Sequence, residues 1–412
     1  MNNMRLKTAL ELAIRSLTLN ILRTSLTVLG VIIGVAAIVI VFAAGDGIRN
    51  LVTGEVASYG TDTIQTEIKV PESSGAAAST EITSLKIDDM EAVNRIENVW
   101  RSYSVSLGQQ KISWQNESKS IFLFGTSAPY TEIDQKSQPI EGRFFTEEED
   151  KSQALVVVLG YKLKDYLFGD QTAVGQWVKI GNNKFQVVGV LEERGGAISM
   201  IDFDNTAFLP IKTLHKKILG IDYVMYMMHQ MKDATKASET AEEIKMLLRE
   251  RHDINDPIDD DFKVTTMDEL MDTLNVVTGA ITWLLLAIVL ISLIVGGVGI
   301  MNIMYVTVSE RTPEIGLRKA LGATYRDIVS QFLIESVLIT FWGAIIGVVF
   351  GLIIAWLMSL LANRFNIVWN FTIPWSGIVT ALIFSLSCGL LFGLRPAQKA
   401  AKLDPVEALR TE

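Results

Sequence analysis

The chain has 412 residues, of which 49% are hydrophobic, and a formal net charge of −9 at pH 7. An acidic chain argues against nucleic acid as a partner, because nucleic-acid binding depends on Lys and Arg contacts to phosphates. The only cysteine is Cys388, so no disulfide can form within the chain and its stability must come from packing.

The first predicted element is an amphipathic helix over residues 1–23, in which Leu6, Leu10 and Leu17 share one face. We expect it to lie on the cytoplasmic surface of the membrane. Residues 24–59 predict the first membrane span (26–44) and a helical stalk that stops near Gly60. The small residues at 43–45 faintly resemble a signal-peptide cleavage site, but the helix that precedes the span favours an uncleaved anchor.

Residues 60–265 predict an α/β domain outside the membrane, with a β-rich insertion over 116–220. Alternating or apolar runs predict strands at 63–70, 154–159, 224–229 and 261–266, and several strands within 100–124. Helical spacing predicts helices at 87–96, 162–168 and 238–251. Residues 178–188 predict a hairpin with a turn over 181–184.

Residues 266–305 predict a stalk and the second membrane span (281–304), started by Thr266 and Glu269 in a capping-box pattern. Residues 306–326 predict a cytoplasmic coupling helix, and 327–362 the third span (333–361). A short external loop (363–375), the fourth span (376–394) and a cytoplasmic tail (395–412) follow. The fold class is therefore a polytopic α-helical membrane protein with four transmembrane helices and a large extracytoplasmic α/β domain on a helical stalk.

The distribution of Lys and Arg orients these spans. Basic residues gather before the first span, between the second and third, and after the fourth, whereas the loop between the third and fourth has only Arg364. Both termini are therefore expected in the cytoplasm of a multi-pass protein of the cell (inner) membrane. Glu335 is the acidic residue of the third span, and the length of that helix favours an interfacial position over a catalytic role.

Small residues spaced four apart occur in every span, and this spacing lets helix backbones approach closely. Glycine is common in membrane helices in any case, so the triple-glycine run of the third span is the strongest example. The expected packing positions are Gly30, Gly34, Gly296, Gly343, Gly347, Gly351, Gly389 and Gly393.

The charged connection between the second and third spans predicts a short helix over 313–321. Thr312 suits its N-cap, Pro313 its first position and Gly322 its end, and Thr324 can then cap the third span, with Asp327 in its first turn. We expect Leu317, Leu321 and Ile328 on one side and the charged residues on another. The alternative is a helix whose basic residues contact lipid headgroups, which would leave its acidic residues unexplained. The expected partner contacts are Glu310, Arg311, Thr312, Pro313, Glu314, Ile315, Leu317, Arg318, Leu321 and Gly322.

The tail predicts a second short helix with Asp404 as its cap, Pro405 at its first position and Glu407 completing a capping box. Val406 and Leu409 would give it a small apolar face. We expect this helix to pack beside the coupling helix and to contact the same partner through Asp404, Pro405, Glu407 and Leu409. A mobile tail is the alternative.

Three sequence segments carry a family resemblance. SERTPEIGLRKALGAT resembles the coupling-helix region of MacB-type ABC transporter permeases, which belong to the FtsX/LolC-like superfamily. FGLRPAQKAAKLDPVEALR is similar to their C-terminal signature, and residues 156–193 are similar to their inserted subdomain. No G-x-x-x-x-G-K-[ST] motif occurs, so the chain looks like the stand-alone permeases that use a separate ATPase.

The resemblance implies a permease that couples ATP hydrolysis by a separate cytoplasmic ABC ATPase to motion of its external domain. ATP and Mg²⁺ would bind to that ATPase and no cofactor or metal to this chain. It also implies pairing with a second permease copy, the same or different, and contact with a membrane-fusion adaptor. The cargo would be an antimicrobial, a peptide or a lipid-like molecule.

Three other functions are the alternatives to transport. Intrinsic catalysis is disfavoured, because His215, His229 and His252 lack metal-ligand spacing and no G-x-S-x-G occurs. An FtsX-like transmembrane regulator of a cell-wall hydrolase shares the four-span plan, although its external domain is usually smaller. A LolC/LolE-like lipoprotein-release subunit is the third alternative.

Overall fold

The computed structural model describes residues 21–56, 60–71, 83–194, 202–364 and 369–410. The predicted N-terminal helix over 1–23 therefore lies almost entirely outside the described residues. The chain divides into two compact units. We call Leu51–Asn275 the sheet unit, and the remaining described residues, which include Val276–Arg364, the membrane unit.

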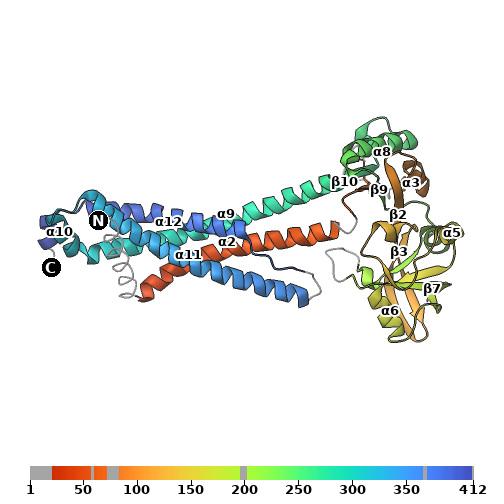
Figure 1. The fold of residues 1–412 in the computed structure, drawn as a ribbon, viewed down its shortest axis with the longest axis horizontal. Coiled ribbons are helices and arrows are strands. Elements are labelled where there is room, and N and C mark those ends of the chain that lie inside the picture. Colours follow the sequence, from red (N-terminus) through yellow and green to blue (C-terminus); the bar gives the residue numbers. More distant parts are fainter. Residues whose placement is uncertain (1–20, 57–59, 72–82, 195–201, 365–368, 411–412) are drawn as a thin grey trace. The chain divides into compact units, whose positions relative to one another are not determined.

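Four long apolar helices form the membrane unit, as the sequence predicts (Figure 1). The parts that are long and apolar enough to cross a membrane are Val28–Gly54, Met267–Glu310, Tyr325–Arg364 and Trp375–Ala401. They belong to α2 (Ile21–Val56), α9 (Met267–Glu310), α11 (Tyr325–Arg364) and α12 (Trp375–Ala401). The first and second of these helices extend beyond the predicted spans into the sheet unit, because apolar helical spacing continues past the length that the bilayer requires.

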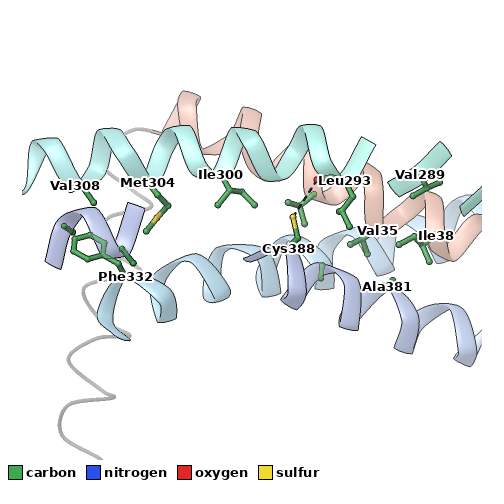
Figure 2. Close-up of a cluster of buried hydrophobic side chains, with 14 of the residues drawn as sticks. Val35, Ile38, Val289, Leu293, Ile300, Met304, Val308, Phe332, Ala381 and Cys388 are labelled. Atoms are coloured by element: carbon green, nitrogen blue, oxygen red, sulfur yellow. Dashed lines mark hydrogen bonds between the residues drawn. The ribbon is translucent and has the colours of Figure 1, made fainter. Parts of the chain in front are cut away.

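The four helices share one cluster of buried side chains (Figure 2). Val35 of α2, Leu293 of α9, Phe332 of α11 and Cys388 of α12 all belong to it. The Cys388 thiol donates to the Leu293 carbonyl at 3.7 Å. Lipid solvates apolar side chains as well as another helix does, so no hydrophobic effect drives membrane helices together. Such helices associate through close packing and interhelical hydrogen bonds.

One half of the sheet unit is an α/β layer. Its strands lie in the order β10-β1-β9-β2, and α3 (Ile87–Val93) and α8 (Ala237–His252) contribute to the core that covers them. Ile64, Ile244 and Phe262 are buried in that core. The strand bounds are β1 (Thr63–Ile68), β9 (Tyr226–Met231) and β10 (Phe262–Thr266).

The other half is a ring of strands, closed because β6 pairs with both β2 and β7. The ring runs β2-β3-β8-β5-β7-β6, and its buried residues form a separate core with α6 (Tyr161–Phe168) and α7 (Ile211–Leu214). The bounds are β2 (Val99–Trp114), β3 (Glu117–Thr126), β5 (Val156–Leu159), β6 (Trp177–Ile180), β7 (Asn183–Leu191) and β8 (Ala207–Pro210). Beyond it lie β4 (Pro139–Gly142), α4 (Tyr130–Ile133) and α5 (Glu147–Lys151).

Two sequence expectations are corrected in this region. Residues 100–124 are not several strands but parts of two long ones, and β2 pairs with β9 through Val105 and with β3 from Val105 onward. Residues 115 and 116 form the turn between β2 and β3, since Trp114 pairs with Glu117. The turn of the second hairpin has two residues rather than four, because Ile180 pairs with Asn183.

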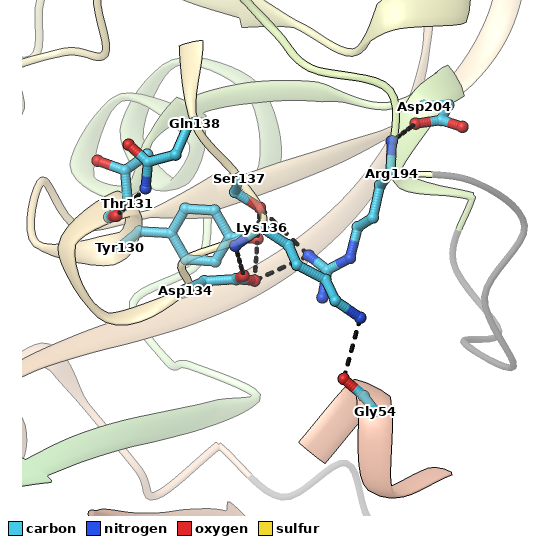
Figure 3. Close-up of polar contacts among 9 residues, drawn as sticks. All are labelled: Gly54, Tyr130, Thr131, Asp134, Lys136, Ser137, Gln138, Arg194 and Asp204. Carbon is cyan, nitrogen blue, oxygen red and sulfur yellow. Dashed lines mark hydrogen bonds and ion pairs between the residues drawn. The ribbon is translucent and has the colours of Figure 1, made fainter. Parts of the chain in front are cut away.

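A buried polar network stabilises the segment after α4 (Figure 3). Asp134 accepts hydrogen bonds from the Arg194 guanidinium at 2.8 Å and from the Tyr130 hydroxyl at 3.0 Å. Arg194 also donates to the Ser137 hydroxyl, and its backbone N–H donates to Asp204. The neighbouring Lys136 ammonium donates to the Gly54 carbonyl in the last turn of α2 at 3.0 Å.

The ends of both long helices also pack on one aromatic cluster in the sheet unit. Tyr103, Phe124 and Tyr130 form its centre, with ring centroids 5.1–5.4 Å apart for the contacts of Tyr130 with the other two. Val52 of α2 packs against it, as do Leu270 and Met271 of α9. The cluster therefore contacts the parts of α2 and α9 that belong to the sheet unit.

His252 holds α8 to its neighbours. Its Nδ1 lies 2.8 Å from Asp261, and its Nε2 lies 3.3 Å from Asp89, which also accepts from Arg251. The hydrogen bonds to Asp261 and Asp89 raise the pKa of His252 to about 9. The imidazole is therefore protonated at neutral pH and bridges two carboxylates.

We expect the stability of the sheet unit to depend on pH through His252. A histidine whose pKa is raised on folding stabilises the native state fully below its unfolded pKa of about 6.5, and this contribution is lost as pH rises through about 9. The urea midpoint of the full chain in detergent, followed by tryptophan fluorescence, should therefore fall between these two pH values. In His252→Gln this dependence should disappear, and an unchanged slope would contradict the assignment.

Candidate functional site

The connection between α9 and α11 is a short helix, α10 (Thr312–Ala320), separated from α9 by Arg311 alone. Its end is a Schellman motif: Ala323 donates to the Arg318 carbonyl, Gly322 donates to the Lys319 carbonyl, and Gly322 has a φ of 95°. Thr324 and Asp327 then cap α11 reciprocally at 3.0 and 3.3 Å. The predicted stop at Gly322 and cap at Thr324 are confirmed.

The predicted start of α10 is wrong by one residue. Thr312 is already helical, and its hydroxyl donates to the Val308 carbonyl at 3.0 Å instead of capping the helix. Because α9 continues to Glu310, the chain passes from one helix to the next without room for a side-chain cap. Pro313 stays within the first turn, where a missing N–H costs nothing.

The inner side of α10 is anchored in the membrane unit. Ile315 is 2% exposed and joins Val308, Ile328 and Phe332 in the buried cluster shown in Figure 2. Ile328 was expected to share a face with Leu317 and Leu321, but it is buried, since it points from α11 into the helix bundle. Ile315 and Ile328 therefore support the connection from behind.

The outer side of α10 exposes large apolar side chains. Leu317 is 53% exposed, and Leu321, at the C-cap, is 80% exposed. Glu314 and Arg318 pair at 2.5 Å, and Arg318 also donates to Gln331 of α11 at 2.7 Å. Charged groups that are already paired therefore flank the two leucines and hold Arg318 in one orientation.

The tail helix α13 (Pro405–Arg410) packs against α10. Asp404 caps it, since its carboxylate accepts from the Val406 N–H at 2.8 Å. Ala408 is buried, whereas Val406 is 76% exposed and Glu407 is exposed. The side chain of Leu409 lies outside the described residues. We call Leu317, Leu321 and Val406 the apolar residues of the α10–α13 surface.

Sequence reasoning missed the residue that joins α10 to the end of α12. The Lys319 ammonium donates to the Ala401 carbonyl at 3.0 Å and to the Leu403 carbonyl, at the end of α12. Lysine near a helix C-terminus is favourable because the last carbonyls lack partners. No local pattern could reveal this contact, since the acceptors lie more than eighty residues away along the chain.

Behind the surface, Arg311 and Glu335 lie 3.5 Å apart, and both are largely buried. Glu335 thus has a cationic neighbour at the connection. Glu310 ends α9 and is exposed. The Arg311–Glu335 pair therefore links the residue between α9 and α10 to α11.

The glycines singled out in the spans lie at helix crossings. A Cβ on Gly296 would come within 3.1 Å of the Gly30 backbone, and one on Gly347 within 2.8 Å of the Ile32 carbonyl. A Cβ on Gly389 or Gly393 would collide with Thr340 or Ser336 of α11. Gly34, Gly343 and Gly351 make similar approaches, to Leu293, Val31 and Val39.

Two serine–histidine contacts in the sheet unit are structural. His229 is buried between Ser102, at 2.8 Å, and Thr66, and burial lowers its pKa to about 3. His215 contacts Ser106 at 2.7 Å and is also buried, which lowers its pKa to about 4. Neither pair is open to a substrate. Among the described residues, no three His, Cys, Asp or Glu side chains are grouped to hold a metal ion.

Comparison with known families accounts for most of the chain. Residues 24–247 match the model of the MacB-like periplasmic core domain, and residues 286–405 match that of the FtsX-like permease C-terminal. These two regions contain, respectively, most of the sheet unit and the α10 connection.

Individual relatives agree with the family models. A macrolide export ATP-binding/permease protein MacB from Wolinella succinogenes is 38% identical over 98% of this chain and 61% of its own length. A pyoverdine export ATP-binding/permease protein PvdT from Pseudomonas savastanoi pv. phaseolicola is 34% identical over 98% of this chain and 59% of its own. The chain thus spans about three-fifths of the length of these curated relatives.

Among solved structures, the periplasmic region of MacB from Actinobacillus actinomycetemcomitans aligns with 53% of this chain and 95% of its own. Its TM-score is 0.46 and its identity is 20%.

Proposed function

The chain belongs to the family of MacB-like and FtsX-like permeases, and from this we propose that it is the permease component of an ATP-driven exporter of MacB type. The observation that carries the proposal is the α10–α13 surface, where Leu317 and Leu321 are exposed on a helix fixed from behind by Ile315 and Lys319. Exposed apolar side chains on a rigid support are suited to fill a pocket in a partner.

The partner in this proposal is a cytoplasmic ABC ATPase, which binds ATP and Mg²⁺ and performs the hydrolysis. The 412 residues contain no G-x-x-x-x-G-K-[ST] motif, and we assign no catalytic step to them. ATP-driven movement of the ATPase would push on Leu317, Leu321 and the tail helix. Glu314 and Arg318 would orient the contact through charge.

Force would then travel along the helices. Helix α9 is continuous from Met267 to Glu310, roughly 65 Å at 1.5 Å per residue, and ends one residue before α10. At its other end Leu270 and Met271 pack on the aromatic cluster of the sheet unit, which also receives Val52 of α2. A change in the tilt of either helix would therefore act on that cluster directly.

The proposal places the protein in the cell (inner) membrane, with both termini cytoplasmic and the sheet unit outside. The excess of Lys and Arg in the flanks of the α10 connection and of the tail supports this orientation. We further propose that two permease copies pair, the same or different, and that the sheet units act with a membrane-fusion adaptor. The cargo is proposed to be an antimicrobial, a peptide or a lipid-like molecule, and the names of the relatives already span a macrolide and pyoverdine.

The FtsX-like match over 286–405 also supports a second function, regulation of an external hydrolase without transport. The surface toward the ATPase would be the same in both. The match to the MacB-like core domain over 24–247 favours export.

In vivo photocrosslinking tests the contact with an ATPase. A photoreactive amino acid replaces Leu321 in the full chain, and the adducts formed in living cells are identified by mass spectrometry. We expect an ABC ATPase as the main adduct. The control position is Met246 of α8, which is 60% exposed but lies in the sheet unit, and it should give no such adduct. The absence of an ATPase adduct at Leu321, or an equal yield at Met246, would overturn the proposal.

A further inference from the structure

Strand β10 lies at one end of the strand order in the sheet unit. Its only partner among the described strands is β1, and the register runs from Ile64↔Thr266 to Ile68↔Phe262. One side of β10 is thus an open edge. Open edges can accept a further strand, and proteins commonly protect them or use them for recognition.

The direction of the backbone groups follows from two hydrogen bonds. Lys69 donates to the Asp261 carbonyl, so odd-numbered residues of β1 bond to β10. Ile68 donates to the Met225 carbonyl beside β9, so even-numbered residues bond to the other side. The residues of β10 opposite these odd-numbered residues direct their backbone groups toward β1, and the residues that alternate with them direct theirs away from it. Phe262 and Val264 therefore direct their N–H and C=O groups to the open edge.

The edge stops where α9 begins. Thr266 would be the next residue to face outward, but its N–H donates to the Glu269 carboxylate at 3.0 Å. The backbone groups that an added strand could pair with are therefore those of Phe262 and Val264. Both side chains are buried in the core beneath α8, which fixes the strand in place.

A groove of about 390 Å³ runs beside this edge and is mainly basic. Its carboxylates are already engaged, since Asp260 binds Arg249 through two hydrogen bonds of 2.7 and 2.8 Å and Glu269 caps Thr266. Thr265 also lines the groove, and its buried hydroxyl makes no hydrogen bond within the described part of the chain. Lysines from three segments line it as well: Lys69, Lys245 and Lys263.

Two of these lysines contact carboxylates on the exposed rim. Lys263 lies 3.7 Å from Glu67, and Lys245 lies 2.8 Å from Glu242. Exposed pairs of this kind contribute little to stability, because water screens both charges. A ligand carboxylate could replace them at small cost.

We propose that the β10 edge binds an extended acidic segment of a partner protein as an added strand. Its backbone would pair with Phe262 and Val264, and its carboxylates would meet Lys69, Lys245 and Lys263. Main-chain hydrogen bonds would supply much of the affinity, and the lysines would select acidic sequences. A second copy of β10 fits poorly, because pairing of the two edges would bring Lys263 close to its own counterpart.

The test uses the full chain in detergent and a fluorescent six-residue peptide of alternating glutamate and valine. Fluorescence anisotropy should show saturable binding, at least tenfold weaker for a matched peptide with lysine in place of glutamate. Lys263→Glu should weaken binding at least tenfold. The matched control is Lys179→Glu, an exposed lysine on β6, whose two edges are both paired, and it should leave binding unchanged.

Hydrogen exchange supplies a second measurement that does not depend on charge. The bound peptide should slow exchange of the Phe262 and Val264 amides, and not that of amides in β6. No binding, or equal binding to Lys263→Glu and to the wild-type chain, would overturn the proposal and leave these lysines as protection of the edge. Because neither measurement involves an ATPase, the result is independent of the proposed function.

Discussion

Leu321→Glu should reduce the ATP turnover of the assembled transporter to that of its ATPase alone. Leu321 is 80% exposed in this chain, so the substitution costs the permease itself little. Burial of a leucine in a partner's pocket contributes about 1.5–3 kcal/mol, and a carboxylate in the same pocket would add a desolvation penalty. The expected loss of affinity is therefore at least about a hundredfold.

The measurement is ATP hydrolysis by the ATPase in lipid nanodiscs with wild-type or variant permease. Met246→Glu places the same charge on an apolar side chain of the sheet unit that is also mostly exposed, and it should keep full stimulation. Leu321→Met, which preserves apolar volume, should keep most of it. Full stimulation by Leu321→Glu would show that force enters the protein elsewhere.

Asp134→Ala should destabilise the sheet unit by about 3–5 kcal/mol. The Asp134 and Arg194 side chains are 0% and 3% exposed, so the substitution leaves a guanidinium buried beside apolar groups without its carboxylate. The Tyr130 hydroxyl loses an acceptor at the same time. Figure 3 shows that these residues hold the segment from which Lys136 reaches the end of α2.

Urea unfolding of the full chain in detergent, followed by tryptophan fluorescence, measures this effect. The matched control is Glu242→Ala, which removes the carboxylate of the exposed Lys245–Glu242 pair and should change the free energy of unfolding by less than about 1 kcal/mol. Similar midpoints for the two variants would show that Arg194 finds equivalent partners and that the network contributes little.

Local patterns in the sequence predicted many details correctly. The capping boxes at Thr266–Glu269 and Thr324–Asp327 are both present, because each needs only residues three apart. The four spans and the stop at Gly322 are likewise present. A long apolar segment and a glycine with a positive φ each restrict the backbone to few conformations.

Errors arose where distant segments decide the outcome. Residues 100–124 contain polar and apolar positions in an order that changes midway, because β2 exchanges β9 for β3 as its neighbour. The sequence therefore suggested several strands where two long ones run. The pairing Ile112↔Ile180 closes the ring of strands, and no local signal marks it.

In the candidate site, too, local patterns predict the helix, whereas contacts between distant segments decide which side chains are exposed. Leu317 and Ile315 are both apolar residues of α10, and their spacing alone does not say which one faces out. Packing of Ile315 against α9 and α11 buries it, and this leaves Leu317 and Leu321 exposed. Lys319 acquires its role from the carbonyl groups at the end of α12.

The sequence by itself determined the number of spans, the short helix between the second and third spans to within one residue, and the family to which the chain belongs. These features depend on the hydrophobic length of each segment and on short-range hydrogen bonds. Tertiary structure alone decided which side of α10 faces a partner, that the strands close into a ring, and that β10 has an open edge. Burial and strand pairing are relations between segments far apart in the chain, so only the folded arrangement fixes which groups face out.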